Sequence, residues 1–113
     1  MITIYHNPRC SKSREGVCLL EEKGLAFKTF KYLDEKITKR ELTSIVKKLK
    51  IKPIALIRTK EELWKQNFAG KEFTDDELIV ILQQNPILIE RPIIINGNKA
   101  VIGRPVERIL EII

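Results

Sequence analysis

The sequence predicts an α/β domain that has a single mixed β-sheet and a helical segment between two halves. A strand, a loop and a helix occupy residues 2–24, and a second strand over 25–33 completes a βαβ half. The chain ends in a β-hairpin and a helix, since Asn96-Gly97-Asn98 separates two apolar runs and is a strong hairpin signal. We therefore expect one domain over residues 1–113, with an insertion over about 38–85.

The βαβ half begins with the alternating apolar and polar residues of Ile2–Tyr5. A helix is expected from about Ser11 to Lys23, and Gly24 closes it. The second strand is expected within residues 25–33, as the second strand of a βαβ unit whose crossover is right-handed.

Two capping boxes mark the helical segment: Thr38 pairs with Glu41, and Thr74 pairs with Glu77. The first precedes an amphipathic stripe, and the second begins a helix that runs to about residue 84 before Asn85-Pro86 stops it. Two shorter helices are expected between them, over 53–58 and around 63–68.

The second half has short strands at Ile93–Ile95 and Ala100–Ile102, and this pair is antiparallel. Gly103-Arg104-Pro105 then opens a terminal helix. We expect the apolar stripe of this helix to consist of Val106, Ile109, Leu110 and Ile113.

Composition excludes several classes of protein. The chain has 113 residues, of which 43% are hydrophobic and 32% charged, and it is neither disordered nor fibrous. Its longest apolar runs are far too short to cross a bilayer, and its start has no secretory signal, so we expect a cytoplasmic protein that does not contact membranes. A net charge of +6 favours anionic partners. The lysine-rich run over residues 47–52 is better explained as the solvated face of a helix than as a nucleic-acid contact.

Cys10 is the candidate nucleophile, because it lies where the first strand has ended and the first helix begins. Free N–H groups of a first helical turn and the helix dipole stabilise a thiolate and lower its pKa. The polarity of the loop argues against a buried, inert cysteine. Positive potential is expected from His6, Arg9, Lys12 and Arg14, and hydroxyl hydrogen bonds to the sulfur from Ser11 and Ser13.

The chain lacks a local resolving thiol, since Ser13 stands where a Cys-x-x-Cys motif has its second cysteine. Cys18 lies eight residues beyond Cys10, about 12 Å along a helix, which is too far for a disulfide. We expect it to be partly packed beside Val17 and Leu20. These features indicate a monothiol mechanism with an external reductant. His6 is the only histidine, which argues against a metal site.

Three arginines occur at structural boundaries: Arg58 ends a short helix, Arg91 precedes Pro92, and Arg104 precedes Pro105. Guanidinium groups bind tetrahedral oxyanions with two parallel hydrogen bonds, so three of them beside a helix N-terminus would form an oxyanion site. Taken singly, each is more often a solvated surface arginine, and only their convergence in space would favour an oxyanion site.

Several separated motifs resemble those of the glutaredoxin-linked arsenate reductases. They are His6-Asn7-Pro8-x-Cys10-x-x-Ser13-Arg14, Phe73-Thr74-Asp75-Asp76, Asn85 to Ile89 with Arg91-Pro92, and Gly103-Arg104-Pro105. The resemblance covers nearly the whole chain. It implies a thioredoxin-like fold with a four-stranded mixed sheet and a cis peptide bond between Arg91 and Pro92.

The resemblance also implies the chemistry. Cys10 would attack arsenate, the arginines at 58, 91 and 104 would hold the oxyanion, His6 would tune the thiolate, and Ser13 would hydrogen-bond the sulfur. Glutathione would join the adduct, arsenite would leave, and glutaredoxin would reduce the Cys10–glutathione disulfide. No bound cofactor or metal is needed, and a monomer is expected.

Two alternatives share this resemblance. Some short relatives are glutathione-dependent thiol reductases of other substrates, and the Arg9, Ser11 and Lys12 side chains are larger than those of typical arsenate reductases. The same fold serves Spx-type regulators, which bind RNA polymerase and use a Cys-x-x-Cys switch. Ser13 removes that switch, and Gly103-Arg104-Pro105 matches the reductases better.

Overall fold

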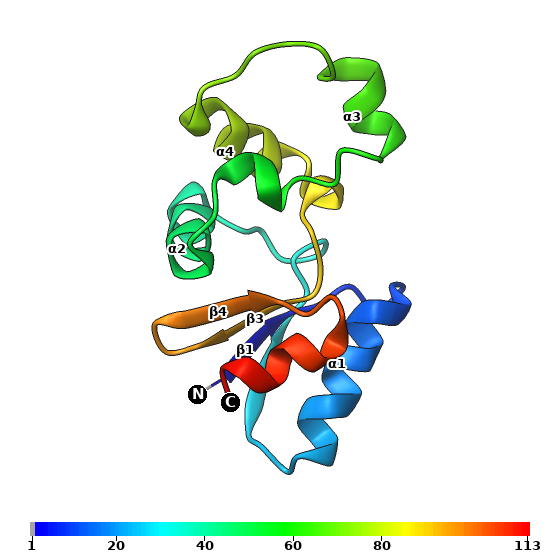
Figure 1. Cartoon of the computed structure of the whole chain (residues 1–113). Helices are drawn as coiled ribbons and strands as arrows, with labels where there is room; N and C mark the ends of the chain where they lie inside the picture. The colour runs from blue at the N-terminus through cyan, green and yellow to red at the C-terminus, as the bar shows by residue number, and fades with distance from the viewer. Residues whose placement is uncertain (1) are drawn as a thin grey trace. The chain divides into compact units, whose positions relative to one another are not determined.

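The computed structural model describes residues 2–113, which divide into two units. The sheet unit comprises the chain up to Lys36 together with Arg91–Ile113, and the helical unit comprises Ile37–Glu90. The segment expected as a helical insertion, over about 38–85, therefore falls within the second unit. Figure 1 shows the order of the elements along the chain.

The sheet unit contains a four-stranded mixed sheet of strand order β2-β1-β3-β4, as the fold class requires. The first strand pairs with the second in parallel and with the third antiparallel, and the hairpin of the third and fourth strands is antiparallel. Its strands are β1 (Ile2–Tyr5), β2 (Phe27–Phe30), β3 (Ile93–Asn96) and β4 (Lys99–Ile102).

The second strand is shorter than the expected 25–33, because only Phe27–Phe30 pairs with β1. Residues 25 and 26 are in neither element, and α1 (Ser11–Glu22) is followed by a turn at Lys23 and Gly24, where Gly24 has a φ of +67°. This left-handed conformation is accessible to glycine without steric cost, so the prediction for the end of the helix is confirmed.

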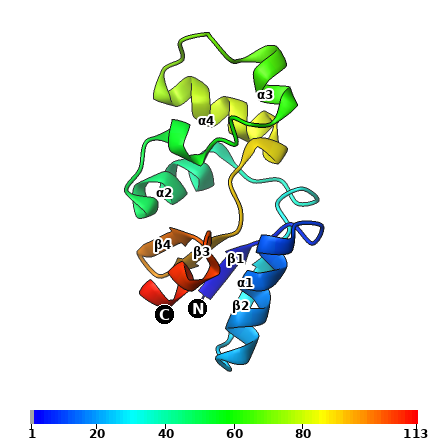
Figure 2. The ribbon, with the colours of Figure 1, turned by 45° about the vertical axis from the view of Figure 1, so that its right-hand side comes forward.

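One face of the sheet carries the apolar core of this unit. Figures 1 and 2 both show α1 and the terminal segment η3 (Val106–Glu111) side by side against the sheet. Their packing excludes water from aliphatic side chains, each contributing about 1.5–3 kcal/mol when fully buried. The buried residues of this core are Ile2, Ile4, Leu20, Ile94, Val101 and Ile109.

The terminal element differs from the expected amphipathic α-helix, because η3 is a 3₁₀-helix. With about three residues per turn, the side chains that share a face are three apart. Val106, Ile109 and Ile112 pack against the core, whereas Leu110 and Ile113 are exposed. The predicted stripe is therefore wrong at its last two positions, for a reason of helical period.

The helical unit is built from α-helices joined by 3₁₀ turns. Its elements are α2 (Lys39–Leu49), η1 (Pro53–Leu56), α3 (Glu62–Asn67), α4 (Asp75–Gln84) and η2 (Pro86–Leu88). Both predicted capping boxes are present, with each threonine hydroxyl accepting from the glutamate N–H three residues on and each glutamate accepting from the threonine N–H. Within residues 2–113, no helix is long and apolar enough to cross a membrane.

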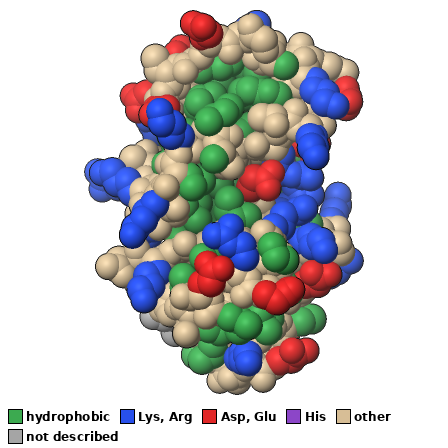
Figure 3. Space-filling model, in the orientation of Figure 1, with side chains coloured by type: hydrophobic (Ala, Val, Ile, Leu, Met, Phe, Trp, Pro, Cys, Tyr) green, Lys and Arg blue, Asp and Glu red, His purple; other side chains and the backbone are tan. Residues whose placement is uncertain are grey.

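Apolar side chains gather over the helical unit on the face drawn in Figure 3. In this unit Trp64, Phe68 and Phe73 form an aromatic cluster with ring centroids 5.5–6.2 Å apart. Trp64 is buried and anchors the short helix α3.

Candidate active site

The register of the sheet brings three parts of the chain to the same end of the strands. Tyr5, the last residue of β1, pairs with Ile93, the first residue of β3, and Ile93 pairs with Ile102, the last residue of β4. The loop that follows β1, the residues that precede β3 and the residues that follow β4 therefore start at the same end of the sheet. These segments carry Cys10, Arg91 and Arg104.

Cys10 is the N-cap residue of α1, as predicted. Its backbone is extended (φ −95°, ψ 122°), its N–H donates to Asn7 O at 3.0 Å, and its own carbonyl accepts from Arg14 N at 3.0 Å. The side chain makes no capping hydrogen bond and is buried, with 8% exposed, so the polarity of the loop did not keep the cysteine at the surface. The sulfur is thus placed at the first turn of a helix whose leading N–H groups lack intrahelical acceptors.

The environment stabilises the ionised form of Cys10. Burial raises its pKa, but this is outweighed by the backbone N–H of Ser13, by the hydrogen bond and charge of Arg91, and by the backbone N–H of Lys12. The net effect is a pKa below the ordinary thiol value. A thiolate is the nucleophilic form of cysteine, so the site favours nucleophilic chemistry.

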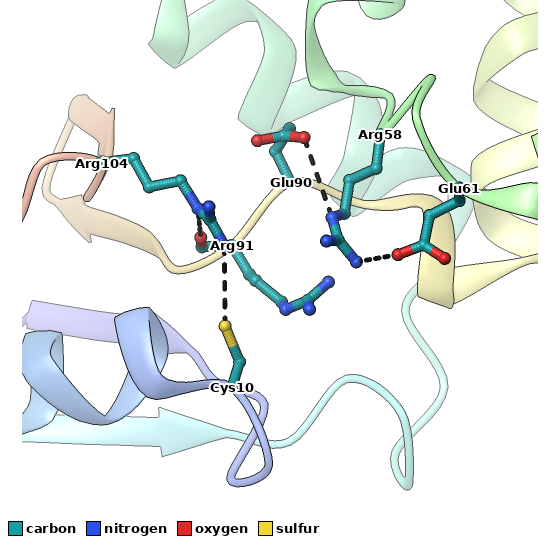
Figure 4. A network of polar contacts seen from close by, with 6 residues as sticks. All are labelled: Cys10, Arg58, Glu61, Glu90, Arg91 and Arg104. Atoms are coloured by element: carbon teal, nitrogen blue, oxygen red, sulfur yellow. Dashed lines mark hydrogen bonds and ion pairs between the residues drawn. The ribbon is translucent and has the colours of Figure 1, made fainter.

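Arg104 connects the two ends of the hairpin to the sulfur. Its Nε donates to Arg91 O at 3.0 Å, and its Nη2 lies 3.7 Å from Cys10 Sγ, as drawn in Figure 4. The peptide bonds Arg91–Pro92 and Arg104–Pro105 are both cis; the resemblance implied only the first. Two of the three predicted arginines therefore meet at Cys10.

Two guanidinium nitrogens of Arg91 are available to donate to a ligand. Its Nε and Nη1 atoms are buried and have no hydrogen-bond partner among the described residues. A buried donor without an acceptor is unfavourable by about 1–3 kcal/mol. An oxygen-rich anion beside Cys10 would satisfy these donors.

Ser13 and His6 form a buried pair beneath the cysteine loop. His6 Nδ1 lies 2.6 Å from Ser13 Oγ, which also accepts from Asn7 N at 2.9 Å. The expectation that the Ser13 hydroxyl bonds the sulfur is corrected, because that hydroxyl faces His6 and the backbone N–H of Ser13 serves the sulfur instead. Asn7, which the sequence analysis did not single out, braces the loop by accepting from Arg9 N at 3.0 Å.

His6 does not supply the positive potential that its position suggested. Burial lowers its pKa first, and the charges of Lys31 and Arg14 lower it further. The imidazole is therefore neutral at pH 7. Arg14 is occupied locally, since its Nη1 donates to Pro8 O at 3.0 Å.

The third predicted arginine, Arg58, belongs to the helical unit, and its role in anion binding stays a prediction. Its Nη1 donates to Glu61 Oε1, and its Nε lies 4.0 Å from Glu90 Oε1, also drawn in Figure 4. Sequence reasoning missed both carboxylates. The i, i+3 spacing of Arg58 and Glu61 was a signal for the first, whereas nothing local indicates Glu90.

Cys18 is exposed, so the expectation that it packs beside Val17 and Leu20 is wrong. The buried positions of α1 are Ser13, Gly16 and Leu20, which leaves position 18 on the outer face of the helix. Among residues 2–113, no group of three or more His, Cys, Asp or Glu side chains could hold a metal ion.

The fold and this site define a thioredoxin-like α/β protein with one cysteine at the start of its first helix. The model of the ArsC family matches residues 5–112, and the chain belongs to that family.

Named relatives agree with this assignment. The chain is 47% identical over 114 residues to an arsenate reductase of Haemophilus influenzae, with 99% of this chain and 98% of the relative covered. It is 41% identical over 110 residues to an arsenate reductase of Neisseria meningitidis, covering 96% and 94%. A solved arsenate reductase from Vibrio cholerae superposes with a TM-score of 0.94 at 42% identity, covering 99% and 97%.

Proposed function

We propose that this protein is a cytoplasmic thiol oxidoreductase that reduces arsenate to arsenite through the Cys10 thiolate. The observation that carries the proposal is the sulfur of lowered pKa next to the guanidinium of Arg104 and the partly unsatisfied guanidinium of Arg91. Its similarity to relatives named arsenate reductases supports arsenate as the oxyanion.

In the proposed reaction, the Cys10 thiolate attacks arsenic and an arsenate oxygen leaves as hydroxide, which takes a proton to become water. Glutathione then joins the adduct, a disulfide forms between Cys10 and glutathione, and the electron pair of the sulfur–arsenic bond stays on arsenic. Arsenic is thereby reduced by two electrons and leaves as arsenite. A glutaredoxin thiolate attacks the glutathione sulfur of the mixed disulfide, a glutaredoxin–glutathione disulfide forms, and Cys10 leaves as a thiolate.

The side chains have separate roles in this scheme. Arg91 and Arg104 bind the equatorial oxygens and stabilise the charge that develops there, and Arg58 joins them as the third oxyanion ligand. Neutral His6 and the Ser13 hydroxyl hold the cysteine loop in shape and take no proton from the substrate. The reaction needs no bound metal or organic cofactor, and the enzyme acts as a monomer.

Arsenite production with glutathione and glutaredoxin tests the proposal. Cys10→Ser should abolish turnover, because a serine hydroxyl is not ionised near neutral pH and cannot form a disulfide with glutathione. Cys18→Ser should keep wild-type turnover. Capture of RNA polymerase subunits by a protein that yields no arsenite would overturn the proposal in favour of a regulator.

A further inference from the structure

Arg58 and Glu90 are brought together by a short antiparallel pairing within the helical unit. Arg58 N donates to Leu88 O at 2.7 Å, Glu90 N donates to Leu56 O at 2.8 Å, and Ile57 pairs with Ile89 between these bonds. Side chains alternate between the two sides of such a ladder, so Arg58 and Glu90 lie on the same side as diagonal neighbours. This placement is set by the backbone.

Glu61 approaches the same guanidinium from the turn that follows Arg58. Glu61 N donates to Arg58 O at 3.1 Å, which folds the chain back, and the Glu61 carboxylate accepts from Arg58 Nη1. The side chains of Arg58, Glu61 and Glu90 are 22%, 28% and 27% exposed. Because they are half-buried, solvent screens these contacts less than it screens a surface ion pair.

Two carboxylates that contact different nitrogens restrict the orientation of a guanidinium group more than one carboxylate does. A single partner neutralises the charge but leaves the guanidinium plane free to swing about that contact. Glu61 at Nη1 and Glu90 at Nε together restrict both the position and the plane of the guanidinium group. The cluster of one arginine and two glutamates carries a net charge of −1. A guanidinium has five N–H donors, so the donors not aimed at carboxylates remain as a fixed fork.

We propose that Glu61 and Glu90 are positioning residues for oxyanion binding: they hold the Arg58 fork in its binding orientation, while their negative charge weakens the attraction of the anion. This inference rests on the proposed function, because Arg58 must be a ligand of the oxyanion. The carboxylates themselves do not touch the substrate.

Alanine and glutamine substitutions at Glu90 should have different effects. Glu90→Ala removes the ion pair at Arg58 Nε, and we expect KM for arsenate to rise about two- to fivefold, the loss of one partly buried ion pair, with kcat changed less than about twofold. Glu90→Gln keeps a side chain of the same length, with an amide oxygen beside Arg58 Nε, and removes a negative charge, so KM should stay at the wild-type value or fall. The same pair of substitutions at Glu61 should behave alike.

Glu62→Ala is the matched control, because Glu62 follows Glu61 in the chain, is exposed, and carries the same charge. Its KM should equal that of the wild type. Arsenate binding by Cys10→Ser protein, measured by titration calorimetry, gives the same comparison without turnover. Thermal unfolding of every variant identifies those that fail to fold, and Glu90→Gln tests the inference if Glu90→Ala is one of them.

Arg58→Ala separates the failure of this inference from the failure of the proposed function. Weaker binding by Arg58→Ala and Glu90→Ala, but not by Glu90→Gln, supports the inference. Weaker binding by Arg58→Ala alone overturns it and leaves Arg58 as a ligand, and so do alanine and glutamine variants with equal effects. Unchanged binding by Arg58→Ala overturns the inference together with the ligand role of Arg58, and no arsenate binding by the Cys10→Ser protein overturns the proposed function as well.

Discussion

The pKa of Cys10 is lowered by hydrogen-bond donors that the fold places around the sulfur. Backbone N–H groups of Ser13 and Lys12 and the guanidinium of Arg91 offset the burial of the sulfur, and neutral His6 takes no part in this balance. Because the folded pKa of Cys10 lies below its unfolded value, ionisation stabilises the folded state above the unfolded pKa. This contribution is lost as the pH falls through the folded pKa.

Ser13→Ala separates the hydroxyl of this residue from its backbone N–H. Removal of the buried hydroxyl leaves Asn7 N and His6 Nδ1 without their partner, so the free energy of unfolding should fall by about 1–3 kcal/mol in chemical denaturation. The pKa of Cys10 should change little, because the donor to sulfur is the main-chain N–H. Ser11→Ala is the control, since Ser11 is exposed. A clear rise of the Cys10 pKa in Ser13→Ala would show that the hydroxyl bonds the sulfur.

At this scale the sequence predicted the position of Cys10 at the start of a helix and its two arginine neighbours, Arg91 and Arg104, but not how the other side chains pair. Cys10 was identifiable because the start of a helix is a local pattern. The contact of His6 with Ser13 and the contact of Arg58 with Glu90 depend on how the chain folds back, which residue types and spacing do not reveal.

At the scale of the elements, Pro92 packs closely against its neighbours in the sheet unit, because two of those neighbours are glycines. A Cβ atom at Gly16 of α1 would lie 3.2 Å from both Ile4 Cδ1 and Pro92 Cγ, and one at Gly103 would lie 3.0 Å from Ile94 Cδ1 and 3.1 Å from Pro92 Cγ. Gly103 N also donates to Pro92 O at 2.8 Å. Close packing against α1 and against the residue after β4 therefore holds the segment that carries Arg91 in place.

Gly16→Ala should disturb this packing around Pro92. The added methyl group overpacks the contact, so we expect about 1–3 kcal/mol lower stability in chemical denaturation, even though alanine favours a helix. Displacement of Pro92 also moves Arg91, and KM for arsenate should rise severalfold. Glu21→Ala, at an exposed position of the same helix, should show neither effect. A Gly16→Ala enzyme with wild-type stability and KM would contradict this account of the packing.

Local signals determined which elements the sequence could predict. Both capping boxes and the Asn96-Gly97-Asn98 hairpin are formed by residues close in the chain, and each is present in the structure. The terminal segment was predicted with the wrong period, because its 3₁₀ form depends on packing against the core, which the sequence pattern does not show.

For the whole molecule, the site in the sheet unit joins residues from opposite ends of the chain. Cys10 and Arg104 lie 94 positions apart, and they meet because β1 pairs with β3. The contact of Arg104 with Cys10 therefore depends on the assembled sheet. The fold class was predictable as a whole from the order of elements and the spread of motifs along the chain, and family membership agrees with it.

The central claim is that the folded chain lowers the pKa of Cys10 below the ordinary thiol value with the help of Arg91. The most direct test is the pH dependence of Cys10 alkylation by iodoacetamide in Cys18→Ser protein, with and without Arg91→Ala. We predict a midpoint below the ordinary thiol pKa of about 8.5, and a higher midpoint when Arg91 is removed. A midpoint at or above 8.5 that does not respond to Arg91→Ala would contradict the account.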